Sequence, residues 1–174
     1  MRAPAGDEAW IGLGTNLGDR AANLDEAARQ FGQAVVAISP VYETAPWGIR
    51  EQPWFLNAVL RLRWTHGARV LLARCLDIEQ ALGRVRAERN GPRTIDIDVL
   101  LAGPGRLDEP GLCVPHPGIA GRRSVLEPWA AVAPELLVPG LDAPLAVLRD
   151  RARSLDGQSV RSWSRAATRA SGTL

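Results

Sequence analysis

The segment Phe55–Trp64 alternates so regularly that it limits the possible folds more than any other part of the chain. Every second residue from Leu56 onward is apolar, while the positions between carry mainly polar or aromatic side chains, including Asn57. Successive side chains of a strand point to opposite faces, so this period of two predicts a strand that is buried on one side. Such strands are typical of antiparallel sheets, which carry helices on one face and leave the other for function.

The patterns before and after this strand predict the element order β-α-β-β-α-β. The expected elements are a buried strand at 8–13, a helix from about Arg20, a strand run at 34–44 interrupted by Pro40, the strand at 55–64, a helix capped by Thr65 and ending at Gly83, and a strand at 94–101. This order is the split βαβ or ferredoxin-like arrangement, an α+β fold with an antiparallel sheet and flanking helices. The length suits one domain, which we expect at 8–150, with 151–174 as a C-terminal extension.

The chain beyond residue 102 shows weaker patterns. We expect a loop at 103–121, short helices at 125–132 and 145–153, and a possible short strand at 160–163. The cysteines fall at Cys75 on a predicted helix and Cys113 in a predicted loop. This spacing matches neither a zinc site nor a disulfide framework.

The composition excludes several classes of function. All 21 basic residues are arginine, which excludes a lysine-dependent P-loop, a Schiff-base mechanism and the lysine of protein kinases. The net charge of +2 is too small to indicate nucleic-acid binding. No apolar run approaches the ~20 residues of a membrane span. Residues 1–9 lack the apolar core of a signal peptide. We therefore expect a cytoplasmic protein with neither nucleic-acid nor membrane partners.

The stretch Arg84–Asp98 combines arginines with two alternating carboxylates. In a strand, Asp96 and Asp98 share one face with Cα atoms ~7 Å apart, where their oxygens could hold hard cations. Guanidinium groups bind phosphate in a forked geometry. A plain surface ion pair between Arg93 and Asp96 would add only ~0–1 kcal/mol. We favour two magnesium ions on the aspartates, with arginines over a triphosphate.

The glycine-rich run Gly12–Gly18 resembles a dinucleotide-binding loop only superficially. Its glycine spacing is one residue too long, and the predicted elements are not a parallel βαβ series. We interpret these glycines as positions where a strand end bends and packs closely.

Other side chains suit a flat heterocycle and a nucleotide. Phe55 and Asn57 share a strand face, so a ring could stack on Phe55 while Asn57 bonds its edge. His116 lies between prolines, six residues before Arg122 and Arg123, which favours a nucleotide contact.

Taken together, these segments resemble the 6-hydroxymethyl-7,8-dihydropterin pyrophosphokinase family. The motifs are Gly-Thr-Asn at 14–16, Tyr-Glu-Thr-Ala-Pro-Trp-Gly at 42–48, Phe-Leu-Asn-Ala at 55–58, Gly-Arg-Val-Arg at 83–86, Gly-Pro-Arg-Thr-Ile-Asp-Ile-Asp at 91–98 and Val-Pro-His-Pro at 114–117. The resemblance extends from about residue 10 to residue 139, and the motif at 91–98 is its most specific part.

The resemblance implies a ferredoxin-like core and transfer of pyrophosphate from ATP to the hydroxymethyl group of the pterin, with release of AMP, in folate biosynthesis. It implies that two magnesium ions bind Asp96 and Asp98. It assigns the ATP phosphates or the transferring charge to Arg84, Arg86, Arg93, His116 and Arg122, the nucleoside to Leu76 and Glu79, and the pterin to Thr44, the backbone from Ala45 to Trp47, Phe55 and Asn57. The implied catalytic set is Arg84, Arg86, Arg93, Asp96 and Asp98.

The chain departs from the family pattern at positions near the acceptor. Ser124 replaces a phenylalanine that usually forms the second stacking ring, and Asn90 replaces a frequent tryptophan. Trp47 or Trp54 could supply the missing ring. One alternative is therefore a MgATP-dependent relative with a different acceptor or impaired pterin binding. Another is an RNA-binding module of the same element order, which the carboxylates disfavour. The general base could be Asp96 or a metal-bound water, and we expect a monomer that binds small molecules only.

Overall fold

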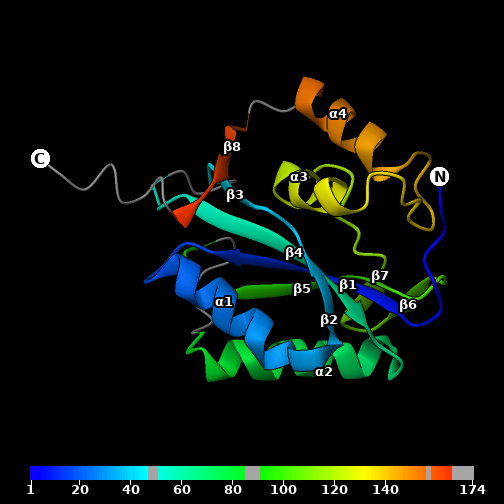
Figure 1. The fold of residues 1–174 in the computed structure, drawn as a ribbon, viewed down its shortest axis with the longest axis horizontal. Helices are drawn as coiled ribbons and strands as arrows, with labels where there is room; N and C mark the ends of the chain where they lie inside the picture. The colour runs from blue at the N-terminus through cyan, green and yellow to red at the C-terminus, as the bar shows by residue number, and fades with distance from the viewer. Residues whose placement is uncertain (47–50, 85–90, 156–157, 166–174) are drawn as a thin grey trace, which may run out of the picture.

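An antiparallel six-stranded sheet forms the centre of the protein, with helices on both of its faces (Figure 1). The computed structural model describes residues 1–46, 51–84, 91–155 and 158–165. Its elements are β1 (Glu8–Thr15), α1 (Arg20–Phe31), a 3-10 turn η1 (Gly32–Ala34), β2 (Val35–Ile38), β3 (Val41–Thr44), β4 (Phe55–Arg63), α2 (Gly67–Ala81), β5 (Asp96–Ala102), β6 (Leu107–Glu109), β7 (Leu112–Val114), α3 (Arg123–Val132), α4 (Leu145–Leu155) and β8 (Val160–Trp163).

Strand β4 pairs with β1 along one edge and with β2 and β3 along the other. The resulting strand order is β5-β1-β4-β3-β8, with β2 beside β4. The break between β2 and β3 falls at Pro40, as predicted, because proline lacks a backbone N–H. Ser39 restores the ladder there, since its N–H donates to the Val59 carbonyl and its hydroxyl accepts from the Val59 N–H, each at 2.9 Å.

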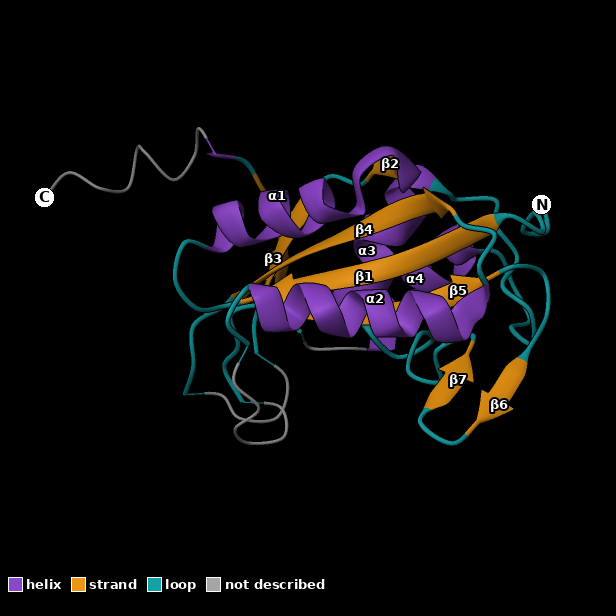
Figure 2. Ribbon diagram, turned by 90° about the horizontal axis from the view of Figure 1, so that it is seen from below, coloured by secondary structure: helices purple, strands orange, loops and turns teal. Residues whose placement is uncertain are grey.

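Helices α1 and α2 lie side by side across one face of the sheet, as Figure 2 shows. The predicted apolar face of the strand at 55–64 points toward them, and Leu56 and Leu60 are buried there. Leu71 and Ile78 of α2 meet Ile97 of β5 in the same cluster. The period-two and helical patterns of the sequence therefore identified this core correctly.

The opposite face of the sheet is only partly open, which the sequence did not predict. Helix α3 packs on β3 and β4, and α4 packs on α3. Trp10 and Trp129 are fully buried between these layers with ring centroids 5.7 Å apart. Burying two such side chains stabilises this half by several kcal/mol, at about 1.5–3 kcal/mol for each large apolar side chain. The part of this face near Asp96 is open at the cavity described below.

Some predicted boundaries differ from the structure. Helix α2 has His66 rather than Thr65 as its N-cap, without a side-chain cap, and ends at Ala81. The predicted loop at 103–121 contains the two-stranded β6–β7 hairpin, so Cys113 lies on a strand. The possible strand at 160–163 is present as β8 and pairs with β3. Within the described parts of the chain, no helix is both long and apolar enough to cross a membrane.

Candidate active site

Two glycines of β1 form the floor of the site. Gly14 lies in register between Asn57 on β4 and Asp96 on β5, and Gly12 lies between Val59 and Asp98. Neighbouring strands are ~4.8 Å apart, so the Asn57 and Asp96 backbones are separated by about 10 Å. A glycine between them leaves this space open. The strand does not end at these glycines as predicted, because β1 continues to Thr15.

A cavity of about 220 Å³ opens above this floor. Eight of the predicted site residues line it, namely Thr44, Ala45, Phe55, Asn57, Arg93, Asp96, Asp98 and Arg122. The remaining wall is formed by Gly12, Leu13, Gly14, Ala58, Val59, Gly121, Ser124, Val125 and Gln158. Of the other predicted residues, Arg84, Leu76, Glu79 and His116 lie outside this lining, while Trp47, Arg86 and Asn90 fall outside the described residues.

Asp96 is held between two guanidinium groups. Nη1 of Arg84 lies 2.7 Å from its Oδ1, and Nη1 of Arg93 lies 2.6 Å from its Oδ2. These side chains are mostly shielded from water, so each pair is stronger than the ion pairs of an exposed surface. The interpretation of Arg93–Asp96 as a plain surface pair therefore does not hold.

Asp98 lies two residues further along β5, on the same strand face as Asp96. Burial, and then the negative charge of Asp96, raise the pKa of Asp98. Among the described residues it forms an ion pair with Arg122, whose Nη1 is 3.8 Å from Oδ2. Two neighbouring carboxylates repel each other unless cations lie between them, so this pair suits hard ions that prefer oxygen ligands.

This donor set fits magnesium better than a fully protein-ligated metal. Among the described residues, no group of three or more His, Cys, Asp and Glu side chains could hold an ion. Magnesium commonly binds through one or two carboxylates and completes its octahedron with water and phosphate oxygens. Asp96 and Asp98 provide this minimum, and an anionic ligand would have to supply the rest.

Glu79 connects α2 to the strand that carries the aspartates. Its buried carboxylate accepts a hydrogen bond from the Ile97 N–H at 2.7 Å and one from Arg84. Burial raises the pKa of Glu79. Glu79 therefore positions Arg84 beside Asp96. Leu76, one turn earlier, is 39% exposed on the surface of α2 and lies away from the cavity wall.

His116 is fixed in one orientation beside Arg122. Its Nδ1 accepts a hydrogen bond from the Gly118 N–H at 3.0 Å, and the backbone N–H of His116 donates to the Leu100 carbonyl at 2.9 Å. Burial lowers the pKa of His116, so the ring is neutral at pH 7 with its proton on Nε2. A Cβ at Gly118 would lie 2.9 Å from Nε of Arg122, so glycine permits this close arrangement.

The other end of the cavity is neutral. Nδ2 of Asn57 donates to the Thr44 hydroxyl at 2.9 Å, which fixes the orientation of the amide. Phe55 lies two residues away on the same strand face. The guanidinium carbon of Arg93 is 5.6 Å from the centroid of the Phe55 ring. Arg93 therefore contacts both the neutral end and the acidic end, and such a stacked contact contributes about 0.5–2 kcal/mol.

Two site residues were missed by reasoning from the sequence. Asn16 holds Arg93 in place, because its Oδ1 accepts from the Arg93 N–H at 2.8 Å while its Nδ2 donates to the Pro53 carbonyl at 2.9 Å. Asn16 directly follows a strand and belongs to the Gly-Thr-Asn motif, so the sequence did contain an indication of its role. Gln158 gave no such signal, since it precedes a short strand in a segment without periodicity.

Most of the chain is similar in sequence to known proteins. A family model described as 7,8-dihydro-6-hydroxymethylpterin-pyrophosphokinase matches residues 10–134. A Methylorubrum extorquens protein named 2-amino-4-hydroxy-6-hydroxymethyldihydropteridine pyrophosphokinase is 45% identical over 136 residues, covering 76% of this chain and 86% of that protein. A Mycobacterium tuberculosis protein of the same name is 40% identical over 163 residues, covering 87% of each.

Solved structures share the fold at low sequence identity. A crystal structure of an HPPK-DHPS protein in complex with substrates has a TM-score of 0.69 at 14% identity. It covers 85% of this chain, which spans 43% of that longer protein. Wild-type HPPK-DHPS of Plasmodium falciparum gives a TM-score of 0.68 at 14% identity, covering 88% of this chain and 46% of its own.

Proposed function

The chain belongs to the 7,8-dihydro-6-hydroxymethylpterin-pyrophosphokinase family, and we propose that it transfers pyrophosphate from ATP to 6-hydroxymethyl-7,8-dihydropterin, releasing AMP, in folate biosynthesis. One observation carries the proposal. A neutral end at Asn57 and an acidic end at Asp96 face the same cavity across Gly14, about 10 Å apart. This spacing allows two different substrates to meet in one site.

The acidic end is the proposed site of ATP and magnesium. Asp96 and Asp98 would hold two magnesium ions, which would supply charge neutralisation to the triphosphate when bound. Arg84, Arg93 and Arg122 would then bind phosphate oxygens. This assignment is supported by the arginine pairs on Asp96 and by the distance of 3.8 Å between Arg122 and Asp98. His116, neutral and oriented by Gly118, would donate from Nε2 to a phosphate oxygen.

The residues at the edge of this end complete the nucleotide assignment. We assign Glu79 to the nucleoside or to the positioning of Arg84, and Leu76 to the nucleoside base, on the family pattern. Arg86 joins the phosphate-binding set by the same pattern, although it lies outside the described residues. The contact between Glu79 and Arg84 supports the positioning role.

The neutral end is the proposed pterin site. A flat heterocycle would stack on Phe55, while Asn57, Thr44 and the backbone from Ala45 to Trp47 would bond its polar edge. At Ala45 this bond would go to the second lone pair of the carbonyl, because the N–H already donates to Ser159. Trp47 belongs to this set by the family pattern and falls outside the described residues. The fixed Asn57 amide supports this assignment, because an oriented donor and acceptor can select a ring edge.

Catalysis in such a site needs positioning and charge stabilisation without a covalent intermediate. The acceptor hydroxyl would attack the β-phosphorus in line with the leaving AMP oxygen. Holding both substrates in one cavity turns their encounter into a reaction within a single complex. This can lower the activation free energy by about 7–11 kcal/mol. The arginines would spread the charge that develops on the transferring group and on AMP.

The wider assignments follow the same proposal. The strand order β5-β1-β4-β3 with antiparallel pairing supports a ferredoxin-like core. We propose residues 8–150 as the catalytic domain, to whose sheet and cavity the extension adds β8 and Gln158, and a monomer as the active form. We place the reaction in the cytoplasm, where ATP is available.

A second candidate is a MgATP-dependent transferase with another acceptor. It is favoured by Ser124, which lines the cavity where the family usually has a ring. The two candidates differ only at the neutral end of the site.

The deciding experiment measures AMP release from MgATP with and without 6-hydroxymethyl-7,8-dihydropterin. We expect AMP to form only with the pterin, and Asp98→Asn to abolish it. The matched control is Asp108→Asn, on the remote β6 strand, which should keep normal turnover. If the folded protein releases AMP from MgATP and the pterin does not change the rate, the first candidate is wrong and the second is favoured.

A further inference from the structure

The cavity wall includes a residue beyond the segment that the family model matches. That match ends at residue 134, whereas Gln158 lines the cavity directly before β8. We propose that Gln158 is an additional acceptor-binding residue, whose side-chain amide contacts the pterin ring and helps to select it. This inference rests on the proposed function, because it names a contact to the same acceptor.

Gln158 lies against the backbone to which the pterin edge is assigned. Its Nε2 donates to the Ala45 carbonyl at 2.8 Å, and the next residue accepts from the Ala45 N–H through its own carbonyl at 2.9 Å. Residues 158 and 159 therefore hold Ala45 from both of its backbone polar groups. The hydrogen bond from Nε2 also fixes the plane of the amide at the edge of the cavity.

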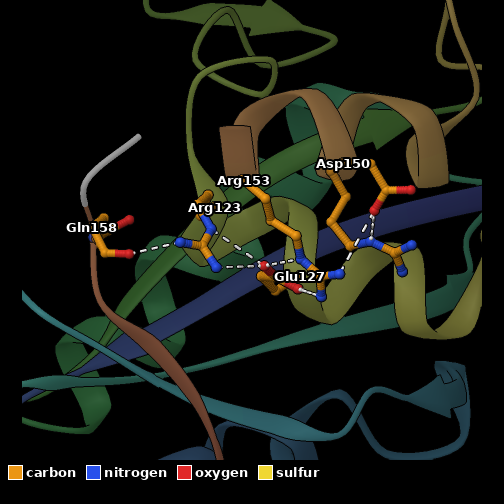
Figure 3. Close-up of polar contacts among 6 residues, drawn as sticks. Arg123, Glu127, Asp150, Arg153 and Gln158 are labelled. Carbon is orange, nitrogen blue, oxygen red and sulfur yellow. Dashed lines mark hydrogen bonds and ion pairs between the residues drawn. The ribbon is translucent and has the colours of Figure 1, made fainter. Parts of the chain in front are cut away.

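Helix α3 fixes the backbone of Gln158 from the other side, as Figure 3 shows. Nη1 of Arg123 donates to the Gln158 carbonyl at 2.7 Å, and Nη2 pairs with Oε1 of Glu127 at 2.9 Å. Arg123 directly precedes Ser124 in the sequence, and Ser124 also lines the cavity. Gln158 is thus held on the wall where the usual stacking ring is absent.

Glu127 makes this support rigid. Its side chain is 2% exposed and lies between Arg123 and Arg153, with Nη2 of Arg153 at 2.5 Å from Oε2 (Figure 3). Burial opposes its ionisation, but hydrogen bonds from Arg153 and Arg123 outweigh burial and lower the pKa of Glu127. The carboxylate is therefore charged at neutral pH, and it joins α3 and α4 to the Gln158 backbone.

A second ion-pair group anchors the same segment beyond Gln158. Arg161 of β8 bonds Glu43 of β3, with Nε 2.7 Å from Oε2, and its guanidinium carbon lies 4.9 Å above the Trp54 ring centroid. Glu43 also accepts from Arg20 at 2.7 Å. Gln158 therefore lies between two fixed points rather than on a loose tail.

The chemistry of a primary amide suits the proposed ligand. A glutamine amide presents a carbonyl acceptor and N–H donors in one plane, and the amino-oxo edge of a pterin presents N–H donors and a carbonyl. An amide that is already oriented loses little rotamer entropy on binding. Gln158 can therefore compensate in part for the stacking surface that Ser124 lacks.

The test compares binding constants for the full chain and its variants. Calorimetry would measure Kd for 6-hydroxymethyl-7,8-dihydropterin in the presence of magnesium and α,β-methylene-ATP, and separately Kd for that nucleotide. We expect Gln158→Ala to weaken pterin binding about tenfold, the usual effect of losing a hydrogen bond with its packing, while nucleotide binding changes less than about twofold. Gln158→Asn, whose side chain is one methylene shorter, should have a pterin Kd between those of the parent protein and Gln158→Ala.

The controls separate a direct contact from a structural effect. Gln33→Ala removes an exposed glutamine outside the cavity, and Ser162→Ala alters an exposed residue on the same strand as Arg161. Both should bind pterin as the parent protein does. An unchanged pterin Kd in Gln158→Ala overturns the inference, and so does an equal loss of nucleotide and pterin binding with a lowered Tm.

The same measurements distinguish this inference from the proposed function. If the parent protein binds pterin and Gln158→Ala binds it more weakly, the contact is supported even if no AMP is released. If AMP is released but Gln158→Ala binds pterin normally, the function stands and the contact is wrong. If the parent protein does not bind pterin at all, both are wrong.

Discussion

Arg84 and Asp96 form an ion pair with 2.7 Å between Nη1 and Oδ1, while Arg93 occupies the other carboxylate oxygen. The carboxylate of Asp96, which is a proposed cation ligand, is therefore neutralised by two arginines. Phosphate groups would compete for the same guanidinium groups. Nucleotide binding and cation binding should consequently favour each other, since each releases a partner of the other.

Replacing Arg84 tests this competition. Arg84→Gln frees Oδ1 of Asp96, so we expect tighter binding of Mn²⁺ to the nucleotide-free protein. Turnover should fall by about 10²–10³, as for other losses of a charge-stabilising donor. Mn²⁺ binding can be followed by electron paramagnetic resonance. The control is Arg69→Gln, whose partner Glu109 is remote from the cavity. Unchanged Mn²⁺ affinity in Arg84→Gln would contradict the competition.

Replacing Asp98 should separate activity from stability. Asp98→Asn removes one of two repelling carboxylates, so we expect Tm without ligands to stay equal or to rise while turnover is lost. Differential scanning calorimetry and AMP release measure the two effects. A strongly lowered Tm would instead indicate that Asp98 mainly stabilises the fold.

Gly14 tests the open floor of the cavity. Gly14→Val suits a strand but places a Cβ 3.4 Å from Oδ1 of Asn57 and adds methyl groups toward the cavity. We expect KM for the pterin to rise about tenfold or more with little change in KM for ATP. Gly14→Ala should have a smaller effect. Gly105→Val, at an open loop position, is the matched control. Equal KM values for Gly14→Val and the parent protein would exclude the floor as a determinant.

Glu127 gives a pH-dependent prediction. Glu127→Gln leaves Arg123 and Arg153 without their carboxylate, which should lower the free energy of unfolding at pH 7 by about 1–3 kcal/mol. The folded pKa of Glu127 lies below its unfolded value of 4.5, so its stabilising effect is complete above that value. The effect is lost as the pH falls through the lower folded pKa.

Urea titrations of Glu127→Gln and the parent protein at pH 7, 4.5 and 3 measure this dependence. The difference between the two proteins should shrink on acidification. Glu26→Gln, in an exposed pair with Arg29, is the control and should have little effect at any pH. A difference that stays constant down to pH 3 would show that the Glu127 charge is not the cause.

Local patterns predicted those parts of the fold in which one surface is buried. The alternation at 55–64 and the break at Pro40 are both present, because strand period and proline chemistry act within a few residues. The covered second face was not foreseen. Its core packs Trp10 against Trp129. These residues are distant in the sequence, and no local pattern indicates that they are in contact.

The candidate site was predicted where chemistry is concentrated in short motifs. Asp96 and Asp98 face the cavity as their spacing indicated, and Asn57 shares it with Phe55. The role of Gly12 and Gly14 as the cavity floor was not predicted. It depends on which residues of β4 and β5 lie beside them, and the local sequence does not show this. Gln158 was missed for a related reason, since its position depends on an arginine and a glutamate from another helix.

The position of β8 at the edge of the sheet also has a consequence for biosynthesis. Among the described elements β8 is translated last, yet residues just before it complete the wall of the cavity. A nascent chain can form β1, β4 and β5 and their helices while the ribosome is still adding residues 158–163. The acceptor end of the cavity is complete only after that segment has left the exit tunnel and paired with β3.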